Sequence, residues 1–471
     1  MTAEMLPGRP GTLTVEQEAK LRELWRATLH VFGVLEKGQS SRTSTDLLNG
    51  SAASLEAGSG EKHKKKRLGL FGRKKNSDTD SGPSTESSAG APAGAEDKYG
   101  QTKQFHEALA NQSPEVLRTT FWSMVKHDHP DALLLRFLRA RKWDVEKALI
   151  MMVSTMNWRA TEMHVDDEII KSGEMGSIER SRSLNHVEVK LGEDFMAQIR
   201  MGKSFLHGVD KMGRPICIVR VRLHKQGEQS EESLERYTVF VIETARMILN
   251  PPIDTACVIF DMTGFSMANM DYTPVKFMIK CFEANYPESL GVVLVHKAPW
   301  IFQGIWKIIK GWLDPVVASK VHFTNSAADM EDFVTKDHIL KELGGEEDWS
   351  YQYIEPLAGE NDKMMDTEAK ERFEVKRQKI VKTYEQDTLE WIETGTGPNA
   401  VEFMRKRNLA AAQLRVNYWE LDPYIRARSI YDRSGMLQPG GRVQFYQGRE
   451  TLSSAPVVNG APVETSSADL D

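Results

Sequence analysis

The stretch GVVLVHKAPWIFQGIWKIIKGWLDP, residues 291–315, joins two patterns that decide the fold. Its first six residues form a continuous apolar run, which is typical of a strand whose two faces are both covered. From Ile301 onward, apolar side chains recur at helical spacing within an arc of about 160°, and Gln303, Lys307 and Lys310 lie opposite. A buried strand followed directly by a helix indicates a sheet with crossover helices.

Similar patterns lie on both sides of this stretch. Strand-like runs occupy residues 215–223, 256–262 and 321–324, and helical patterns occupy residues 234–249 and 274–286. The later runs are apolar throughout, as expected for parallel strands covered by helices. The sequence therefore predicts an α/β fold with a mixed, largely parallel sheet.

Two interpretations of the helix at residues 300–313 stay open. Leaving its eight large apolar side chains in water would forfeit on the order of ten kcal/mol, so something covers them. One interpretation is a central crossover helix in a protein core, which the pattern alone favours. The other is a helix with a hydrophobic ligand inside and a membrane interface outside, which the two tryptophans and the lysine-bearing face favour.

The rest of the chain divides by composition. Residues 14–33 predict a helix that begins behind a Thr14 cap with Gln17 three residues on, and Ser113-Pro114 and Asp144 are further helix starts. We therefore expect six segments: an N-terminal helix (12–35), a disordered insertion (36–102), a helical subdomain (103–163), an α/β domain (175–345), a C-terminal helical extension (362–435) and a disordered tail (436–471).

Charge and cysteine usage restrict the class of protein. The net charge of −6 argues against a general nucleic-acid binder. Cys217, Cys257 and Cys281 lie in apolar surroundings without CxxC spacing, which indicates buried, reduced thiols in a cytosolic protein. No run approaches the roughly 18 apolar residues of a spanning helix. We expect a cytoplasmic protein whose membrane contact is peripheral.

Motifs for nucleotide or hydrolytic chemistry are incomplete. GKS at residues 202–204 lacks the glycine that a phosphate loop needs, because Ala197 stands there. No GxSxG or HExxH occurs, and HDHPD at residues 127–131 is interpreted as a helix-ending turn. The sequence therefore predicts neither an enzyme nor a metal site.

A basic stretch lies within the expected insertion. EKHKKKRLGLFGRKK, residues 61–75, carries eight Lys or Arg against one Glu. Three interpretations stay open: a solvated charge run, a nuclear import signal, or a tether to anionic membranes, for which each basic residue contributes about 1 kcal/mol.

Five landmarks in one order resemble the Sec14-like, or CRAL-TRIO, lipid-binding proteins. They are LLRFLRARKWDVEKA, DKMGRP, VIFDMTGFS, YPESLGVVLVHKAPWIF and WLDPVVASKV, within residues 115–345. The resemblance implies a helical N-terminal subdomain and a mixed α/β domain that encloses a lipid pocket. It also implies that the helix at 300–313 is a gate, formed by Ile301, Phe302, Ile305, Trp306, Ile309 and Trp312.

The same resemblance implies a site for the phosphatidylinositol head group. Its members here are Arg141, Lys142, Glu288, Val317 and Lys320. Arg141 can bind a phosphodiester with two hydrogen bonds, Lys320 adds a compact positive charge, and Glu288 can accept from inositol hydroxyls. Val317 stands where the family has a threonine, so one phosphate donor is missing.

The second-ligand site departs further from the family. Leu206, Cys217, Ala256 and Val258 stand where the founding member has hydroxyl side chains for phosphatidylcholine, and none is a strong donor. A buried phosphocholine would be poorly paired, so we expect a nonpolar second ligand such as a sterol precursor. Some relatives bind haem through Tyr and His, for which His207 and Tyr237 are the candidates; no other cofactor is expected.

These expectations combine into one function with an alternative. We expect a carrier or exchanger of phosphatidylinositol and a second hydrophobic lipid, which opens its gate at membrane surfaces, anionic ones included. The alternative is a lipid-dependent sensor or scaffold that presents phosphatidylinositol, or its own surface, to a partner protein. A transfer assay between liposomes distinguishes the two.

Overall fold

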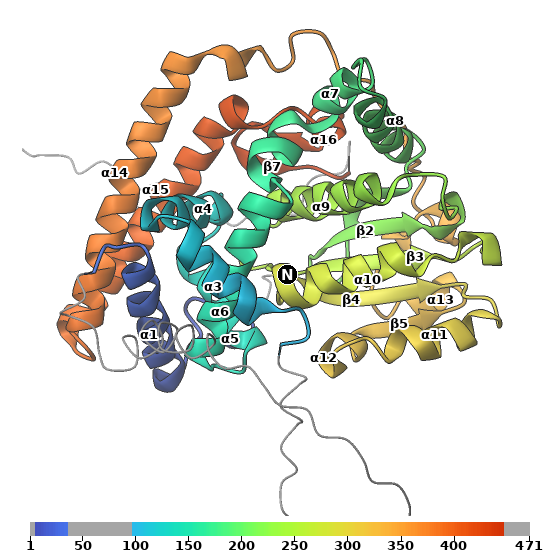
Figure 1. Ribbon diagram of the computed structural model, residues 1–471. Helices are drawn as coiled ribbons and strands as arrows, with labels where there is room; N and C mark the ends of the chain where they lie inside the picture. Colours follow the sequence, from blue (N-terminus) through green and yellow to red (C-terminus); the bar gives the residue numbers. More distant parts are fainter. Residues whose placement is uncertain (1–4, 36–96, 447–471) are drawn as a thin grey trace, which may run out of the picture.

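The computed structural model describes residues 5–35 and 97–446, and in it a helical half lies beside a half built on a sheet (Figure 1). The sheet has five strands in the order β1 to β5, and only β1 and β2 are antiparallel. The predicted mixed, largely parallel sheet is therefore confirmed. The strands are β1 (Ser204–Val209), β2 (Pro215–Arg220), β3 (Ala256–Asp261), β4 (Leu290–His296) and β5 (Val321–Thr324).

Crossover helices connect the parallel strands. α9 (Glu231–Ile248), α10 (Tyr272–Lys280) and α11 (Phe302–Lys310) follow β2, β3 and β4 in turn. Two elements that precede the predicted strands were not expected: β1 itself and the helix pair α7 (Lys171–Arg180) and α8 (His186–Arg200). β1 escaped the pattern because its six residues, SFLHGV, include a histidine and a glycine.

Both faces of the sheet are covered, which explains the uninterrupted apolar runs. Alternate residues such as Val258 and Val293 pack toward α9, α10 and α11. Their neighbours Ile259 and Leu294 pack on the other face against a segment that includes α13 (Ala327–Met330) and Leu343.

The helical half has one hydrophobic core that residues from both ends of the chain share. The expected helix starts are present: Thr14 and Gln17 form a capping box, and Ser113 and Asp144 cap their helices. The C-terminal helices pack on the N-terminal ones, and they lie within the expected extension at 362–435. The elements of this core are α1 (Val15–Val31), α3 (Gln101–Asn111), α4 (Pro114–Val125), α5 (Pro130–Ala140), α6 (Val145–Asn157), α14 (Thr367–Glu393) and α15 (Pro398–Ile425).

A buried carboxylate joins four of these helices. Asp131 of α5 accepts hydrogen bonds from Trp25 Nε1 (2.6 Å), Tyr384 OH (2.9 Å) and Arg407 Nη2 (2.5 Å). Burial alone would raise the pKa of Asp131, but the charge of Arg407 and these donors hold it below its ordinary value. Asp131 is therefore ionised, and its hydrogen bonds join the C-terminal helices to α1 and α5.

Two expected boundaries are corrected. α3 begins at Gln101, so the ordered chain resumes before residue 102. Residues 436–446 are also ordered and contain the hairpin β6 (Leu437–Gln438) and β7 (Arg442–Val443), because Met436 and Leu437 are buried and Tyr446 OH accepts from Val209 N (3.0 Å). The remainder of the expected insertion, with its basic stretch, and of the expected tail lies outside the described residues.

All three cysteines are buried free thiols, as expected. Burial raises the pKa of the Cys217 thiol to about 12. Among the residues that the structure describes, no helix combines the length and the apolar character that crossing a bilayer requires.

Candidate functional site

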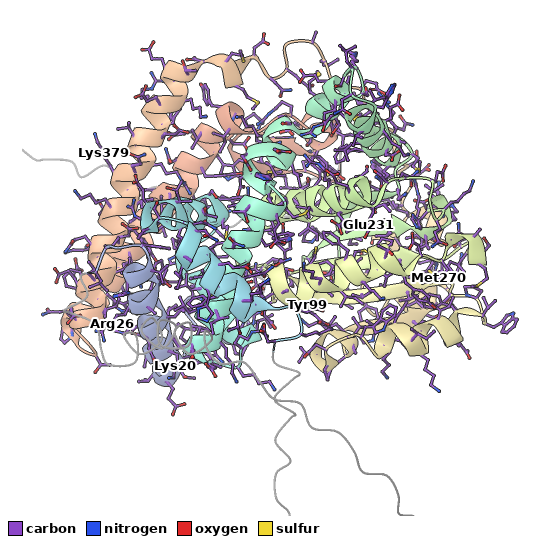
Figure 2. All side chains as sticks on the ribbon, in the orientation of Figure 1. Lys20, Arg26, Tyr99, Glu231, Met270 and Lys379 are labelled. Atoms are coloured by element: carbon purple, nitrogen blue, oxygen red, sulfur yellow. The ribbon has the colours of Figure 1, made fainter. Side chains whose placement is uncertain are left out.

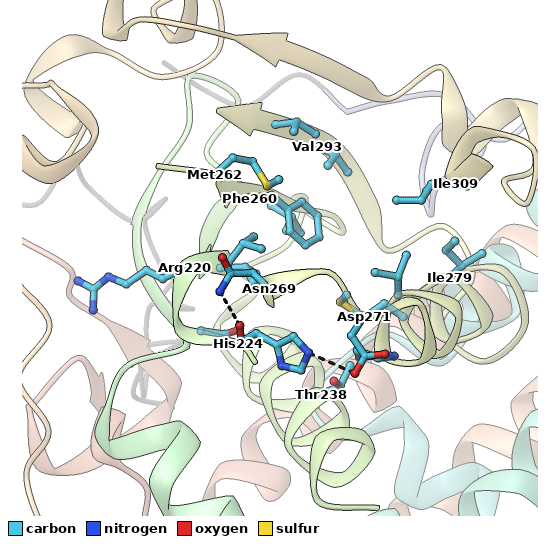
Figure 3. Close-up of a pocket in the computed structure, with 18 of the residues that line it drawn as sticks. Arg220, His224, Thr238, Phe260, Met262, Asn269, Asp271, Ile279, Val293 and Ile309 are labelled. Carbon is cyan, nitrogen blue, oxygen red and sulfur yellow. Dashed lines mark hydrogen bonds and ion pairs between the residues drawn. The ribbon is translucent and has the colours of Figure 1, made fainter. Parts of the chain in front are cut away.

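An apolar cavity of about 220 Å³ lies between the sheet and the helices α9, α10 and α11 (Figure 3). β3 and β4 supply its floor, because the side chains that alternate toward this face are Val258, Phe260, Val293 and Val295. α11 supplies much of the opposite wall, where Phe302, Trp306 and Ile309 line the cavity.

The polar side chains at one end of this cavity bind one another. His224 Nε2 lies 3.3 Å from Asp271 Oδ2, and Asn269 Nδ2 donates to His224 O (2.8 Å), as Figure 3 shows. Lys203 Nζ donates to Gln229 Oε1 (2.6 Å), and burial lowers the pKa of Lys203 to about 8. Since these groups have partners within the protein, the cavity offers a ligand mainly apolar surface.

A second cavity, of about 810 Å³, adjoins the first and is rich in charge. Five apolar residues line both cavities and form their common boundary; they are Ile279, Phe282, Leu290, Leu313 and Val317. The basic side chains that line the charged cavity are Lys98, Arg139, Arg141, Lys142, Lys276 and Lys320. Its acidic residues are Glu283, Glu288 and Asp314.

All five residues expected at a head-group site line this charged cavity. Arg141 is the C-cap of α5, Lys142 follows it, and Glu288 precedes β4. Val317 lies in α12 (Pro315–Ala318), and Lys320 precedes β5. Five positions that span 180 residues of sequence are thus brought to one cavity.

The backbone at two of these positions is held in an uncommon conformation. Lys142 has φ 51° and Glu288 has φ 54°, which side chains other than glycine rarely adopt. The Lys142 amide donates to Arg139 O (3.1 Å), and Arg136 Nη1 donates to Glu288 O (2.8 Å). Strained positions persist where the surrounding structure fixes them, and they cluster at functional sites.

The charges of this cavity are unequally paired. Arg141 Nη2 donates to Gln101 Oε1, among other contacts. Glu288 Oε2 lies 4.0 Å from Arg139 Nε, while Arg139 is closer to Asp254 (3.0 Å). Within residues 5–35 and 97–446, neither Lys142 nor Lys320 forms an ion pair or a side-chain hydrogen bond.

The four residues expected at the second-ligand site do not line one cavity. Of the four, only Val258 lines the apolar cavity. Leu206 and Cys217 pair across β1 and β2, in the same core as the C-terminal residue Tyr431, whose hydroxyl accepts from Leu206 N (3.0 Å). Ala256 lies at the start of β3, where its amide donates to Ser289 O (2.9 Å). Leu206, Cys217 and Ala256 are therefore not among the residues that line the apolar cavity.

α11 combines both interpretations of its sequence. Phe302, Ile305 and Ile309 are buried, whereas Trp300 (83% exposed) and Ile308 (48% exposed) face solvent. The helix is shorter than expected because Gly311 and the Asp314 cap of α12 follow it. The remaining residues of the expected gate divide: Ile301 is exposed, Trp306 lines the apolar cavity, and Trp312 lines the charged cavity and packs on Tyr272 (5.3 Å between ring centres).

His207 and Tyr237 do not converge on a haem-sized site. His207 stacks on Trp349 (3.9 Å between ring centres), lies 2.9 Å from Glu347 Oε1 and does not line the apolar cavity. Tyr237 lines the cavity, but its hydroxyl donates to Ser204 O (2.7 Å). His129 caps α5, and no group of three metal-ligating side chains occurs in the described part of the chain.

Sequence reasoning missed other residues of the charged cavity. Lys98 and Tyr99 line it from the end of the low-complexity segment. Lys276 lines it from α10, and Glu283 lines it from the segment that follows α10. One signal was available: Tyr99 is the first aromatic residue after Phe71.

Comparison with known proteins identifies the family. Residues 101–154 match the model of the CRAL/TRIO N-terminal domain, and residues 199–345 match that of the CRAL/TRIO domain. The chain belongs to the CRAL-TRIO family, in its fungal Sec14-like branch, whose members are lipid-binding transfer proteins and not enzymes.

Two relatives align with nearly the whole chain. CRAL-TRIO domain-containing protein C3H8.02 of Schizosaccharomyces pombe is 46% identical over 92% of this chain and 93% of its own length. Phosphatidylinositol transfer protein CSR1 of Eremothecium gossypii is 38% identical over 93% of this chain and 100% of its own length. The crystal structure of Sfh5 covers 54% of this chain and 90% of its own, at 14% identity and a TM-score of 0.37.

Proposed function

We propose that this protein binds phosphatidylinositol and carries it between membranes, or exchanges it there for a second, nonpolar lipid. The observation that carries this proposal is the charged cavity that lies directly beside an apolar one and shares five lining residues with it. A phospholipid has two matching parts, an anionic head group for the charged cavity and acyl chains for the apolar one. A phosphatidylinositol transfer protein among the relatives supports the choice of lipid.

The head group would lie among the residues of the charged cavity. Arg141 would bind the phosphodiester with its guanidinium fork, and Lys142 and Lys320 would add charges that have no ion-pair partner in the described protein. Glu288 would accept from inositol hydroxyls. Val317 adds no hydroxyl to this set, so its side chain contributes only apolar contact at the boundary with the chains.

The second ligand would be nonpolar. Lys203, His224, Asn269 and Asp271 bind one another or neighbouring protein groups, so they offer little to a charged ligand. A phosphocholine there would remain poorly paired, which costs several kcal/mol, roughly the cost of burying an unpaired polar group. A sterol precursor or another hydrocarbon-like lipid meets no such cost.

α11 would be the gate through which these lipids pass. Its inner side chains Phe302, Trp306 and Ile309 line the apolar cavity, and Trp300 and Ile308 face outward beside exposed lysines. Acyl chains lose about 0.8 kcal/mol per CH₂ on entering water, so opening is favourable only when the gate docks on a bilayer. Lys307 and Lys310 would favour an anionic surface.

The basic stretch at residues 61–75 would be a second membrane contact. Its eight basic residues against one acidic residue suit an anionic surface. Deleting residues 61–75 is expected to weaken binding to phosphatidylserine-containing liposomes at low salt. Unchanged binding would remove the tether from the proposal.

A transfer assay tests the proposed function. Purified protein is mixed with donor liposomes that carry labelled phosphatidylinositol and with unlabelled acceptors. The wild type should speed transfer, and the Arg141→Ala, Lys320→Ala double variant should lose at least tenfold, because two charge-assisted contacts to phosphate are removed. The matched control Arg405→Ala, Lys406→Ala removes the same two residue types from the exposed surface of α15 and should transfer normally.

Two other results would contradict the proposal. Wild-type protein that binds phosphatidylinositol without moving it between liposomes would favour the sensor or scaffold. Equal transfer by the wild type and the double variant would exclude the charged cavity as the head-group site.

A further inference from the structure

The gate helix has few polar attachments to the rest of the protein. Across residues 302–314, the hydrogen bonds that reach past the flanking residues 299–301 and 315–318 to other described residues involve only Lys98 and Glu283. Trp312 also packs on Tyr272, and Lys276 Nζ lies 4.9 Å from the centre of the Trp312 ring. The polar attachment is therefore concentrated at the C-terminal end of the helix.

Glu283 is the centre of this attachment. It lies in the turn Cys281–Asn285 that extends α10, and its side chain is only 8% exposed. Its carboxylate accepts from Tyr99 OH (2.6 Å), Lys98 Nζ (2.9 Å) and Asp314 N (2.7 Å). Lys98 Nζ also donates to Trp312 O (2.5 Å). Three segments that are distant in sequence thus meet on one carboxylate.

We infer that Glu283, Lys98 and Tyr99 form a latch that positions the C-terminal end of the gate helix in its closed state. Glu283 is a positioning residue, since it acts on the gate through Asp314 and Lys98. The inference rests on the proposed function only in taking α11 as the gate. Figure 2 shows Tyr99 at the junction of the helical half and the sheet half.

The latch differs in kind from the other contacts of the gate. The apolar face of α11 loses little when it moves from the cavity wall to the interior of a bilayer, because both are apolar surroundings. The hydrogen bonds to Glu283 have no equivalent in acyl chains. They therefore favour the closed state specifically. Burial, and then the bond to Glu283, raises the pKa of Tyr99, so its hydroxyl stays a donor.

The same segment reaches the head-group residues. Gln101, two residues after Tyr99, accepts from Arg141 Nη2 and donates to Ala284 O (3.3 Å), next to Glu283. Lys98 and Tyr99 themselves line the charged cavity. Docking of residues 98–101 therefore links the head-group cavity to closure of the gate.

Hydrogen exchange of the gate amides, residues 302–310, tests the latch in the full-length purified protein. Lys98→Met removes two hydrogen bonds and should speed their exchange about tenfold, and Tyr99→Phe removes one and should speed it about threefold. Glu283→Gln weakens the centre of the latch. The double variant Glu283→Gln, Tyr99→Phe should speed exchange of the gate amides by less than the product of the two single accelerations, because both substitutions act on one interaction.

Controls separate the latch from general stability. Lys103→Met removes a lysine whose pairing with Glu107 is exposed, and it should leave gate exchange unchanged. The strand amides of residues 290–296 should exchange as in the wild type in every variant. Unchanged gate exchange in Lys98→Met and Tyr99→Phe, or equal acceleration in gate and strand, would overturn the latch. Absent lipid transfer by the wild type would instead refute the proposed function and leave this result standing.

Discussion

Two clusters of basic side chains among the described residues differ in what neutralises them. The inner cluster is Lys126, Arg159 and Arg246, with the carboxylates Asp166 and Glu243. Arg159 contacts both carboxylates at 2.6 Å, and Lys126 lies 3.1 Å from Asp166. Burial by itself would raise the pKa of Glu243, but the charges of Arg159, Arg246 and Lys126 lower it well below its ordinary value.

The outer cluster is Lys142 and Lys320, which line the charged cavity. Within residues 5–35 and 97–446, neither lysine has a carboxylate at ion-pair distance. A buried charge has to be paired within the protein, whereas a charge at an open cavity stays hydrated until a ligand binds. The presence of carboxylate partners, and not the number of basic residues, therefore distinguishes a structural cluster from a proposed binding site.

The largest effect is expected in the inner cluster. Arg159→Met leaves Glu243 and Asp166 with fewer partners and should lower the free energy of unfolding by about 3–5 kcal/mol, the usual result of breaking a buried ion pair. Urea denaturation at pH 7 measures this change. A loss under 1 kcal/mol would contradict a structural role for the inner cluster.

Lys203 is a third case for this comparison. It is buried, as the inner cluster is. Among the described residues it has no carboxylate at ion-pair distance, as is true of the outer lysines. Its pKa falls from 10.5 to about 8, so between these values the unfolded chain holds a proton that the folded chain has released. Stability should therefore rise with pH across this window, by roughly 2–3 kcal/mol relative to Lys203→Met. Denaturation at pH 7, 9 and 10.5 measures it, and parallel profiles would contradict the assignment.

Val317→Thr should strengthen the outer site. A hydroxyl at this position can donate to a phosphate, which is worth about 1 kcal/mol, or about fivefold in affinity for phosphatidylinositol. A competition assay with labelled lipid measures the gain. The control Val317→Ala removes apolar contact without adding a donor and should not strengthen binding; an equal gain in both variants would rule out the phosphate contact.

The smallest effect on stability is expected from the outer lysines. Lys142→Ala and Lys320→Ala, taken singly, should change the free energy of unfolding by less than about 0.5 kcal/mol, since neither side chain has an ion-pair or hydrogen-bond partner among the described residues. Differential scanning calorimetry is the measurement. A loss above 2 kcal/mol would make these lysines structural and remove the contrast with the inner cluster.

Much of the fold could be predicted because it depends on local pattern. The apolar runs at 256–262 and 291–296 identified strands covered on both faces, and Thr14, Ser113 and Asp144 marked helix starts. The head-group candidates followed from the order of the family motifs. Their common cavity is a fact of the structure, while their role remains our proposal.

What could not be predicted depends on contacts between distant segments. The hydroxyl of Tyr431 accepts from Leu206 N across 225 residues of sequence, a contact that no local pattern indicates. Lys98 ends a low-complexity segment, and Glu283 resembles an ordinary glutamate near a helix end. Only the fold brings the two within 2.9 Å of each other beside the gate.

Mass spectrometry of the lipids extracted from purified protein tests the central claim most directly. Phosphatidylinositol should accompany the wild type and the Arg405→Ala, Lys406→Ala control, and it should be depleted at least tenfold in the Arg141→Ala, Lys320→Ala variant, while a neutral lipid remains. Phosphatidylinositol retained at the wild-type level in that variant, or absent from the wild type, would contradict the assignment of the charged cavity.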